Sequence, residues 1–126
     1  MSKILSLQGI VGAPDLSHVD VATPEWGDDA VVRVRMLSGA ERDAYAEKMK
    51  KRVTGTGPSA KVDTQGIKLD LLEMCMVDER GERLVNIPDD RVLLNAKSAT
   101  VLDRIHDAAA KLNGIGEDAE KDAEGN

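Results

Sequence analysis

Hydrophobic and polar residues partly alternate along the segment from about residue 19 to residue 37. Val32, Val34 and Met36 fall on one face of an extended chain, and the arginines between them fall on the other. Gly, Asp and Asp occupy positions 27–29, and these residue types favour a turn. The alternation and the turn together predict a β-hairpin over residues 19–37.

A helix is predicted directly after this hairpin. Ser38 and Glu41 have the spacing of a capping box, in which each side chain accepts a hydrogen bond from the other residue's backbone amide. Acidic residues come early in the following segment and basic residues come late, an order that complements the helix dipole. We expect this helix to reach about residue 52, with Tyr45, Met49 and Val53 along one face.

The next two segments differ sharply in composition. Residues 54–64 contain two glycines and a proline, which predict a flexible surface loop. Residues 65–77 carry apolar side chains around almost the whole helical circumference. The sequence therefore predicts a helix over residues 65–77 and makes it the most buried element of the fold.

Two further helices complete the predicted fold. Pro88 suits the first turn of a short helix over about residues 88–96. Ser98 can cap a last helix over residues 99–112, which should end at Asn113-Gly114. Hydrophobic residues of this last helix form a wide stripe at helical spacing. They are Val101, Leu102, Ile105, Ala108, Ala109 and Leu112.

The predicted fold class is α+β and mostly α, with an N-terminal β-hairpin followed by about four helices. Residues 1–18 are expected to form a flexible arm, residues 19–114 a single domain, and residues 115–126 a disordered acidic tail. Five acidic residues and one lysine lie in 117–126, so this segment holds −4 of the net charge of −6. The rest of the chain is therefore nearly neutral.

Composition narrows the functional classes. Aromatic residues make up 2% of the chain and the net charge is negative, which argues against a nucleic-acid partner. No apolar run approaches the roughly 20 residues that a membrane-spanning helix needs, so we expect no membrane segment. The one cysteine, Cys75, fits a reducing cytoplasm better than a disulfide framework.

Residues with catalytic or ligating potential are few. His18 and His106 lack the clustered partners that a metal site needs. Cys75 lies in the most apolar segment, where a thiol is usually an inert hydrophobic group, although a site pairing it with His106 stays an alternative. We therefore expect a binding or assembly protein that is not an enzyme and that has no catalytic residue, metal or cofactor.

Two motifs have weak functional signals. Residues 55–60 fit the spacing of a dinucleotide-binding loop, but no strand precedes them and Pro58 lacks a backbone amide, so a linker is the expected reading. Residues 48–52 hold four cations, which fit either a helix C-terminus or a contact with an anionic partner.

The ordered layout of several segments resembles a known protein family. The segments are residues 24–27 (PEWG), 31–35 (VVRVR), 37–45 (LSGAERDAY), 76–84 (MVDERGERL), 93–99 (LLNAKSA) and 112–114 (LNG). In this order they are similar to the tail assembly chaperones of long-tailed, non-contractile phages and prophages, and the match spans about residues 20–120. Residues 85–88 (VNIP) depart from the family pattern, which has an aromatic residue and a Ser/Thr-Asp pair there.

The resemblance implies a role in viral tail morphogenesis. Such chaperones act in the host cytoplasm, bind and solubilise the tape measure protein, recruit tail tube subunits, and are absent from the mature virion. A second hypothesis is a structural phage component, such as a tail-terminator-like or head–tail joining subunit. Self-association along a long helical target would suit a chaperone of this kind.

Hydrophobic helix faces are the candidate partner-binding surfaces. Burial in the chain's own core is the alternative explanation for at least half of these residues. The candidates are Tyr45, Met49, Val101, Leu102, Ile105 and Leu112.

Overall fold

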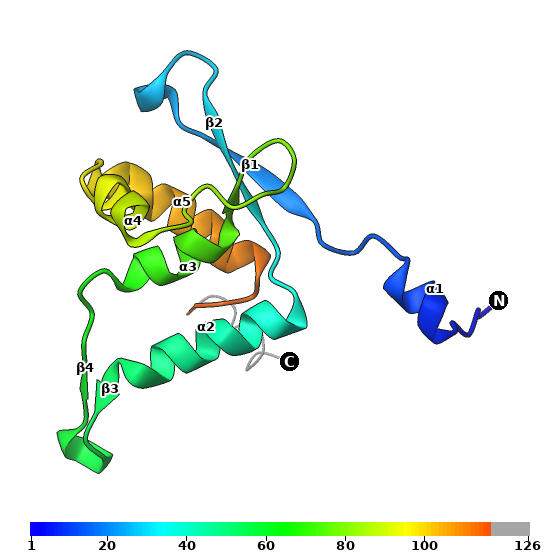
Figure 1. Cartoon of the computed structure of the whole chain (residues 1–126), viewed down its shortest axis with the longest axis horizontal. Coiled ribbons are helices and arrows are strands. Elements are labelled where there is room, and N and C mark those ends of the chain that lie inside the picture. The colour runs from blue at the N-terminus through cyan, green and yellow to red at the C-terminus, as the bar shows by residue number, and fades with distance from the viewer. Residues whose placement is uncertain (117–126) are drawn as a thin grey trace.

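The computed structural model describes residues 1–116, and the predicted acidic tail lies mostly outside them. The fold is α+β and mostly α, as predicted (Figure 1). Short 3₁₀ turns occur at Pro24–Trp26 and Gly57–Ser59. The helices are α1 (Leu7–Val11), α2 (Gly39–Lys51), α3 (Ile67–Cys75), α4 (Pro88–Asn95) and α5 (Ala99–Leu112); the strands are β1 (His18–Ala22), β2 (Val31–Arg35), β3 (Val53–Thr54), β4 (Lys61–Val62) and β5 (Met76–Val77).

Strands β1 and β2 form the predicted antiparallel hairpin. Val21 pairs with Val32, and Val34 is fully buried on the face that meets the helices. On the opposite face Asp20 pairs with Arg33, whose Nε lies 2.7 Å from a carboxylate oxygen. The alternation in the sequence therefore separates a core face from a charged face, as expected for a half-buried sheet.

The predicted helix over residues 65–77 is too long at its C-terminal end. Met76 and Val77 leave the helix and form β5, which pairs antiparallel with β2 and gives the strand order β1-β2-β5. The free edge of β2 offers backbone groups that need partners, and Met76 and Val77 satisfy them while staying buried. The rest of the prediction is confirmed: α3 has six buried residues among nine.

Helix α2 begins with the predicted capping box. The Glu41 amide donates to the Ser38 hydroxyl at 3.2 Å, and the Ser38 amide donates to the Glu41 carboxylate at 3.1 Å. Arg52 is the C-cap, which confirms the predicted end. Val53 lies beyond the helix in β3 and is exposed, so it does not extend the Tyr45–Met49 face as predicted.

The segment predicted to be a flexible loop, residues 54–64, instead forms most of a small second hairpin. Val53 pairs with Val62 and Thr54 with Lys61, and a 3₁₀ turn caps the hairpin. Gly55 and Gly57 adopt φ values of 84° and 62°, which glycine reaches without steric cost. The two glycines that predicted a loop therefore lie in the turn of this hairpin.

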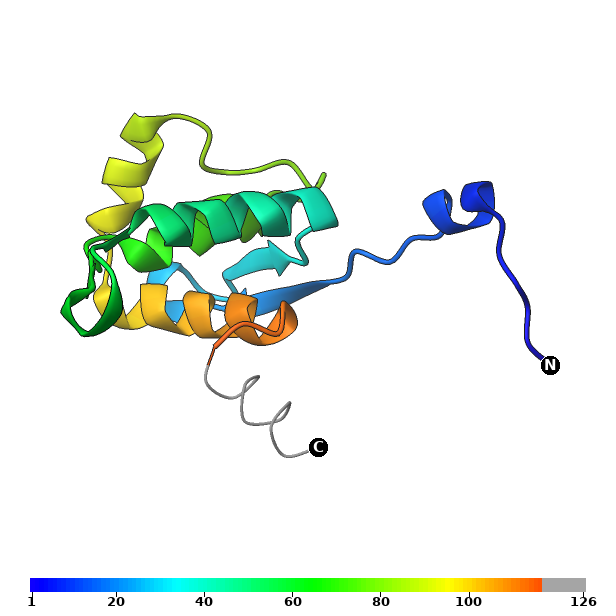
Figure 2. The ribbon, with the colours of Figure 1, turned by 90° about the horizontal axis from the view of Figure 1, so that it is seen from below.

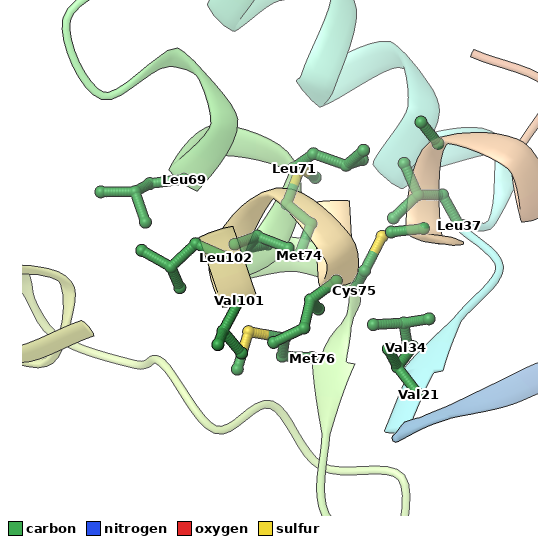
Figure 3. Close-up of a cluster of buried hydrophobic side chains, with 14 residues drawn as sticks. Val21, Val34, Leu37, Leu69, Leu71, Met74, Cys75, Met76, Val101 and Leu102 are labelled. Carbon is green, nitrogen blue, oxygen red and sulfur yellow. The ribbon is translucent and has the colours of Figure 1, made fainter. Parts of the chain in front are cut away.

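The hydrophobic core lies where α3 and α5 pack together and against the three-stranded sheet (Figure 3). Helix α3 also contacts α2 and α4, and it lies between α2 and the α4–α5 pair (Figure 1). The largest fully buried hydrophobic side chains are Leu71, Leu72, Ile105, Val34, Val101 and Cys75. This is the aliphatic, ring-poor core that the composition required.

Asn113 connects the end of α5 by hydrogen bonds to the segment between β2 and α2. Its Oδ1 accepts from the Leu37 amide at 2.8 Å, and its Nδ2 donates to the Ala109 carbonyl at 2.9 Å. Arg42 donates to the Asn113 carbonyl at 2.7 Å. The predicted helix stop is confirmed, and its Asn also fixes the tertiary position of the helix.

The N-terminal arm, residues 1–17, extends away from the body in both views (Figures 1 and 2). It contains the short helix α1, whose N-cap Ser6 accepts from the Gly9 amide at 3.2 Å. No side chain of the arm is buried. The sequence predicted an arm here but not this helix.

Candidate partner-binding surface

Three of the six predicted partner-binding residues belong to the chain's own core. Val101, Leu102 and Ile105 are 1%, 7% and 0% exposed, because their face of α5 packs on α3 and the sheet. Figure 3 shows Val101 and Leu102 pointing into this cluster. In this conformation these three side chains cannot contact a partner.

The other three predicted residues are half-buried. Leu112 packs against the edge of the core near the end of α5. Tyr45 and Met49 lie one turn apart on the side of α2 that faces the body, and Tyr45 packs against the core. Burial raises the pKa of the Tyr45 hydroxyl, and the nearby Asp70 carboxylate raises it further. These residues keep only part of their surface for a partner.

Helix α2 has no fully buried residue, and ion pairs hold both of its ends. At its start, Glu41 lies 2.6 Å from Arg35 and 2.8 Å from Arg83. At its end, Arg52 Nε lies 2.6 Å from Asp70, which is 5% exposed. Arginine–carboxylate contacts therefore position this helix more than hydrophobic burial does.

Asp70 is the centre of a charged cluster beneath α2. It accepts from Arg52 and from Arg91, and Arg91 also lies 2.8 Å from Glu73, which Lys48 contacts at 3.2 Å. Burial raises the Asp70 pKa, but the hydrogen bonds from the two arginines outweigh it and leave the pKa below its usual value. The cluster ties α2, α3 and α4 together.

This cluster bears on the basic run at residues 48–52. Arg52 forms an ion pair with Asp70, and Lys48 forms one with Glu73, so both cations bind carboxylates of the same chain. Among the described residues, Lys50 and Lys51 form no ion pair. The run therefore offers fewer free cations than its sequence indicated.

The most exposed hydrophobic side chains lie elsewhere, on α4 and on the N-terminal arm. Val92 and Leu93 of α4 are 69% and 70% exposed, next to the half-exposed Ile87 that precedes the helix. Sequence reasoning missed this surface because Val92 and Leu93 also fit a buried face. The arm exposes Ile4, Leu5, Leu7, Ile10, Val11 and Leu16.

A pocket of about 230 Å³ opens beside the C-terminal end of α4. The start of α3, the end of α4 and the start of α5 form its wall, and Ile67, Leu69 and Leu102 supply apolar surface. Lys68 and Asp103 form an ion pair at the same site. Sequence analysis could not locate this pocket, because three separate segments build it.

The alternative catalytic residues occupy separate environments. Cys75 is fully buried, and burial raises the pKa of its thiol to about 11. Its hydrogen-bond partner is Asn113, at 3.6 Å. Burial lowers the pKa of His106, and the nearby Asp107 carboxylate offsets part of this effect. Among residues 1–116, no His, Asp or Glu side chain hydrogen-bonds the thiol, and the two groups lie in different surroundings.

Two further sequence features have structural outcomes. Residues 55–60 form the connection between β3 and β4 of the small hairpin. They therefore do not join a strand to a helix, as a dinucleotide-binding loop does. In the part of the chain that the structure describes, no group of three or more potential ligands could hold a metal ion. Over the same residues, none of the helices has the length and hydrophobicity needed to cross a bilayer.

Comparisons with known proteins give one informative result. No protein-family model matches the chain, and no curated protein sequence does. Among solved structures, the fold is similar to that of the bacteriophage HK97 tail assembly chaperone, with a TM-score of 0.55 and 18% sequence identity. The match covers 88% of this chain and 96% of the HK97 chain. At this identity the similarity establishes a shared fold.

Proposed function

We propose that this protein is a tail assembly chaperone of a long-tailed, non-contractile phage or prophage. The observation that carries the proposal is the fold similarity to the HK97 chaperone, which extends over nearly the full length of both chains. The ordered sequence segments from residue 24 to residue 114 support the same family independently of the fold. In this role the protein binds and solubilises the tape measure protein and recruits tail tube subunits.

The exposed face of α4 is the surface we assign to the target. A chaperone for a long helical protein needs solvent-exposed hydrophobic side chains that can cover an apolar helix face. Val92 and Leu93 meet this requirement, whereas Val101, Leu102 and Ile105 are already buried. Tyr45, Met49 and Leu112 would offer separate, smaller contacts through the parts of their side chains that remain exposed.

The proposed role requires no catalysis. The buried Cys75 thiol, with a pKa of about 11, is a poor nucleophile at neutral pH. The chaperone would act in the host cytoplasm and be absent from the finished virion. The acidic residues of 117–126 would add like charge to each chaperone–target complex and help to keep such complexes apart.

Co-expression with the tape measure protein encoded in the same gene cluster tests this proposal. The wild-type chain should move that protein into the soluble fraction and co-purify with it. Replacing both Val92 and Leu93 by Ser should abolish this effect, while a matched variant with exposed Val31 and Val62 replaced by Ser should retain it. Unchanged solubility with the wild-type chain, and no complex, would contradict the proposal.

Mature particles provide a second test. A structural tail component would remain in purified virions, whereas a chaperone would be missing from them. Mass spectrometry of purified particles should therefore find the tail tube protein without this chain. A stoichiometric amount of this chain in the particles would instead favour a tail-terminator-like or head–tail joining subunit.

A further inference from the structure

Three exposed lysines lie at the junction of α2 and the β3–β4 hairpin. Lys50 and Lys51 belong to the last turn of α2, and Lys61 lies on β4. Strand β3 begins two residues after Lys51, and its Thr54 pairs with Lys61, so the hairpin brings the third lysine to this end of the helix. Among residues 1–116, none of the three forms an ion pair. Together they form the basic surface.

The carboxylates close to the basic surface leave most of its charge unbalanced. Two acidic residues are nearest in the sequence: Glu47 lies one turn earlier on α2, and Asp63 lies two residues after Lys61. The Asp63 carboxylate lies 4.0 Å from Arg52. Within residues 1–116, neither acidic residue forms an ion pair with the basic surface. Because neighbouring like charges repel, an anionic segment bound across the three lysines would be favoured.

The same chain contains an anionic segment of matching charge. Residues 117–126, the acidic segment, lie outside the described part of the structure and have a net charge of −4. Their acidic residues are Glu117, Asp118, Glu120, Asp122 and Glu124. This segment therefore carries enough negative charge to balance all three lysines of the basic surface.

The chain leaves the described body beside α2. Arg42, near the start of α2, donates to the Asn113 carbonyl at 2.7 Å, and the Ile115 amide donates to the Ala110 carbonyl at 2.8 Å. Figure 1 shows α2 running from the end of α5 toward the β3–β4 hairpin. The last described residues thus lie near the start of α2, whereas the basic surface lies at its end.

The length of α2 is short compared with the reach of the acidic segment. A helix rises about 1.5 Å per residue, so Lys50 and Lys51 lie about 12–14 Å along the axis of α2 from Arg42. An extended chain spans about 3.3 Å per residue, so ten residues reach roughly 33 Å. Acidic residues in the middle of the segment can therefore meet the basic surface.

Covalent connection favours the acidic segment over a separate acidic protein. A segment tethered by a short linker has a local concentration on the order of millimolar at its own surface. Single ion pairs between exposed side chains are weak, so the contact depends on several pairs at once and on low salt. A contact of this kind covers the lysines and can still be displaced.

We propose that the acidic segment, residues 117–126, folds back along α2 and binds Lys50, Lys51 and Lys61 of the same molecule. The bound segment is an internal competitor: an acidic stretch of another protein must displace it before reaching the basic surface. The proposal concerns the chain alone and does not depend on the function proposed above.

Paramagnetic broadening of amide signals in the full-length chain tests the contact. A nitroxide attached to Ala123→Cys reports which residues approach the acidic segment, since the native Cys75 is buried. At an ionic strength of about 0.01 M, the signals of the basic surface should lose most of their intensity. They should recover in about 1 M salt, where charges more than roughly 3 Å apart are screened. A loss confined to residues 108–116, or an equal loss over the whole body, would overturn the proposal.

Matched charge variants identify the groups that hold the segment. Lys50→Gln with Lys51→Gln removes two charges from the basic surface, and glutamine keeps the helix propensity without placing an acid at the helix C-terminus. Lys3→Gln with Arg80→Gln removes two charges from exposed sites that form no ion pair within residues 1–116. The first variant should lose most of the broadening at Lys61, and the second should keep it. Equal broadening at Lys61 in both variants would contradict the contact.

A mixing experiment distinguishes the same molecule from a second copy. A chain that carries both the isotope label and the nitroxide should keep its broadening when it is diluted into an excess of unlabelled wild type. Isotope-labelled wild type mixed with nitroxide-labelled chain of natural isotope composition should show no broadening. The reverse pattern would place the acidic segment on another copy and refute the proposal.

A free peptide with the sequence of residues 117–126 tests the competitor role. The comparison is between the wild type and a full-length variant with an uncharged acidic segment. That variant carries Glu117→Gln, Asp118→Asn, Glu120→Gln, Asp122→Asn and Glu124→Gln. The peptide should shift the amide signals of the basic surface in this variant at a several-fold lower concentration than in the wild type. Equal concentrations for both proteins would argue against displacement.

Cross-linking of the unmodified chain keeps the proposal testable if a variant fails to fold. A carbodiimide joins a carboxylate directly to a lysine amine that touches it, and mass spectrometry locates the linked residues. In the monomer fraction, acidic residues of 117–126 should be linked to the basic surface. Links to Lys111 alone, or links found only in dimers, would overturn the proposal.

Discussion

Glu41→Gln separates the ionic role of Glu41 from its role as a helix cap. In the native protein, the carboxylate accepts from the Ser38 amide at 3.1 Å and pairs with Arg35 and Arg83. Gln can still accept from Ser38, so the capping box is retained. The substitution removes the negative charge and replaces the oxygen that accepts from Arg35 and Arg83 by an NH₂ donor, so both arginines lose their carboxylate partner.

The pKa of Glu41 indicates how large the effect should be. The hydrogen bond from Arg35 is the main reason that this pKa falls from 4.5 to about 2, with Arg83 and the Ser38 amide adding to it. A shift of this size corresponds to about 3 kcal/mol. Because the side chain is 19% exposed, solvent screens part of the interaction, and we expect a loss of about 2 kcal/mol at pH 7.

The pH dependence has a definite sign. A carboxylate whose pKa is lowered on folding stabilises the protein above its unfolded-state pKa of about 4.5, and this stabilisation disappears as the pH falls toward 2. The wild type should therefore lose its advantage over Glu41→Gln across this interval. Below it, both proteins carry an uncharged residue 41 and should have nearly equal free energies of unfolding.

Urea unfolding followed by far-UV circular dichroism at pH 7, 5, 4 and 3 measures this difference. Glu47→Gln is the control, because Glu47 is exposed on the same helix and forms no ion pair among the described residues. It should change the free energy of unfolding by less than about 0.5 kcal/mol. The reasoning is refuted if Glu41→Gln matches the control at pH 7, or if its deficit is the same at every pH.

Three other predictions follow from the core and the charged cluster. Asp70→Asn should lower the free energy of unfolding by about 3–5 kcal/mol, because it leaves Arg52 and Arg91 facing a neutral side chain. The control Asp43→Asn, at an exposed position, should lower it by less than about 0.5 kcal/mol. Similar losses for the two variants would contradict the role of Asp70. Ile105→Ala should cost about 2–5 kcal/mol by chemical denaturation, and a loss below 1 kcal/mol would argue against its burial. The Cys75 thiol should react with a thiol reagent only when the protein unfolds, and rapid labelling of the native protein at pH 8 would contradict its raised pKa and its burial.

Local signals in the sequence predict most of the fold. The capping box at Ser38, the cap at Ser98 and the stop at Asn113 are each set by residues within one or two turns, and the structure confirms all three. The β1–β2 hairpin is also local, because a short connection joins its strands. These elements depend on little beyond their own residues.

Two of the errors arise where distant segments decide the outcome. Met76 and Val77 continue an apolar run that fits a helix, yet they form a strand because the edge of β2 lies beside them in the folded chain. Likewise, the hydrophobic stripe of α5 fits a core and a binding surface equally well. Only the packing of Ile105 on α3 and the sheet places that stripe in the core.

The way α2 is attached has a consequence for the dynamics of the native protein. With no fully buried residue, this helix can separate from α3 by breaking the ion pairs at Glu41, Lys48 and Arg52. The half-buried Tyr45 and Met49 would leave the edge of the core, while its fully buried side chains stay packed. Its amide protons should therefore exchange with solvent through a local opening that needs less free energy than global unfolding, whereas those of α3 and α5 should exchange only when the whole domain unfolds. Because the carboxylates of these ion pairs are largely buried, added salt should weaken the pairs and speed exchange in α2 only slightly.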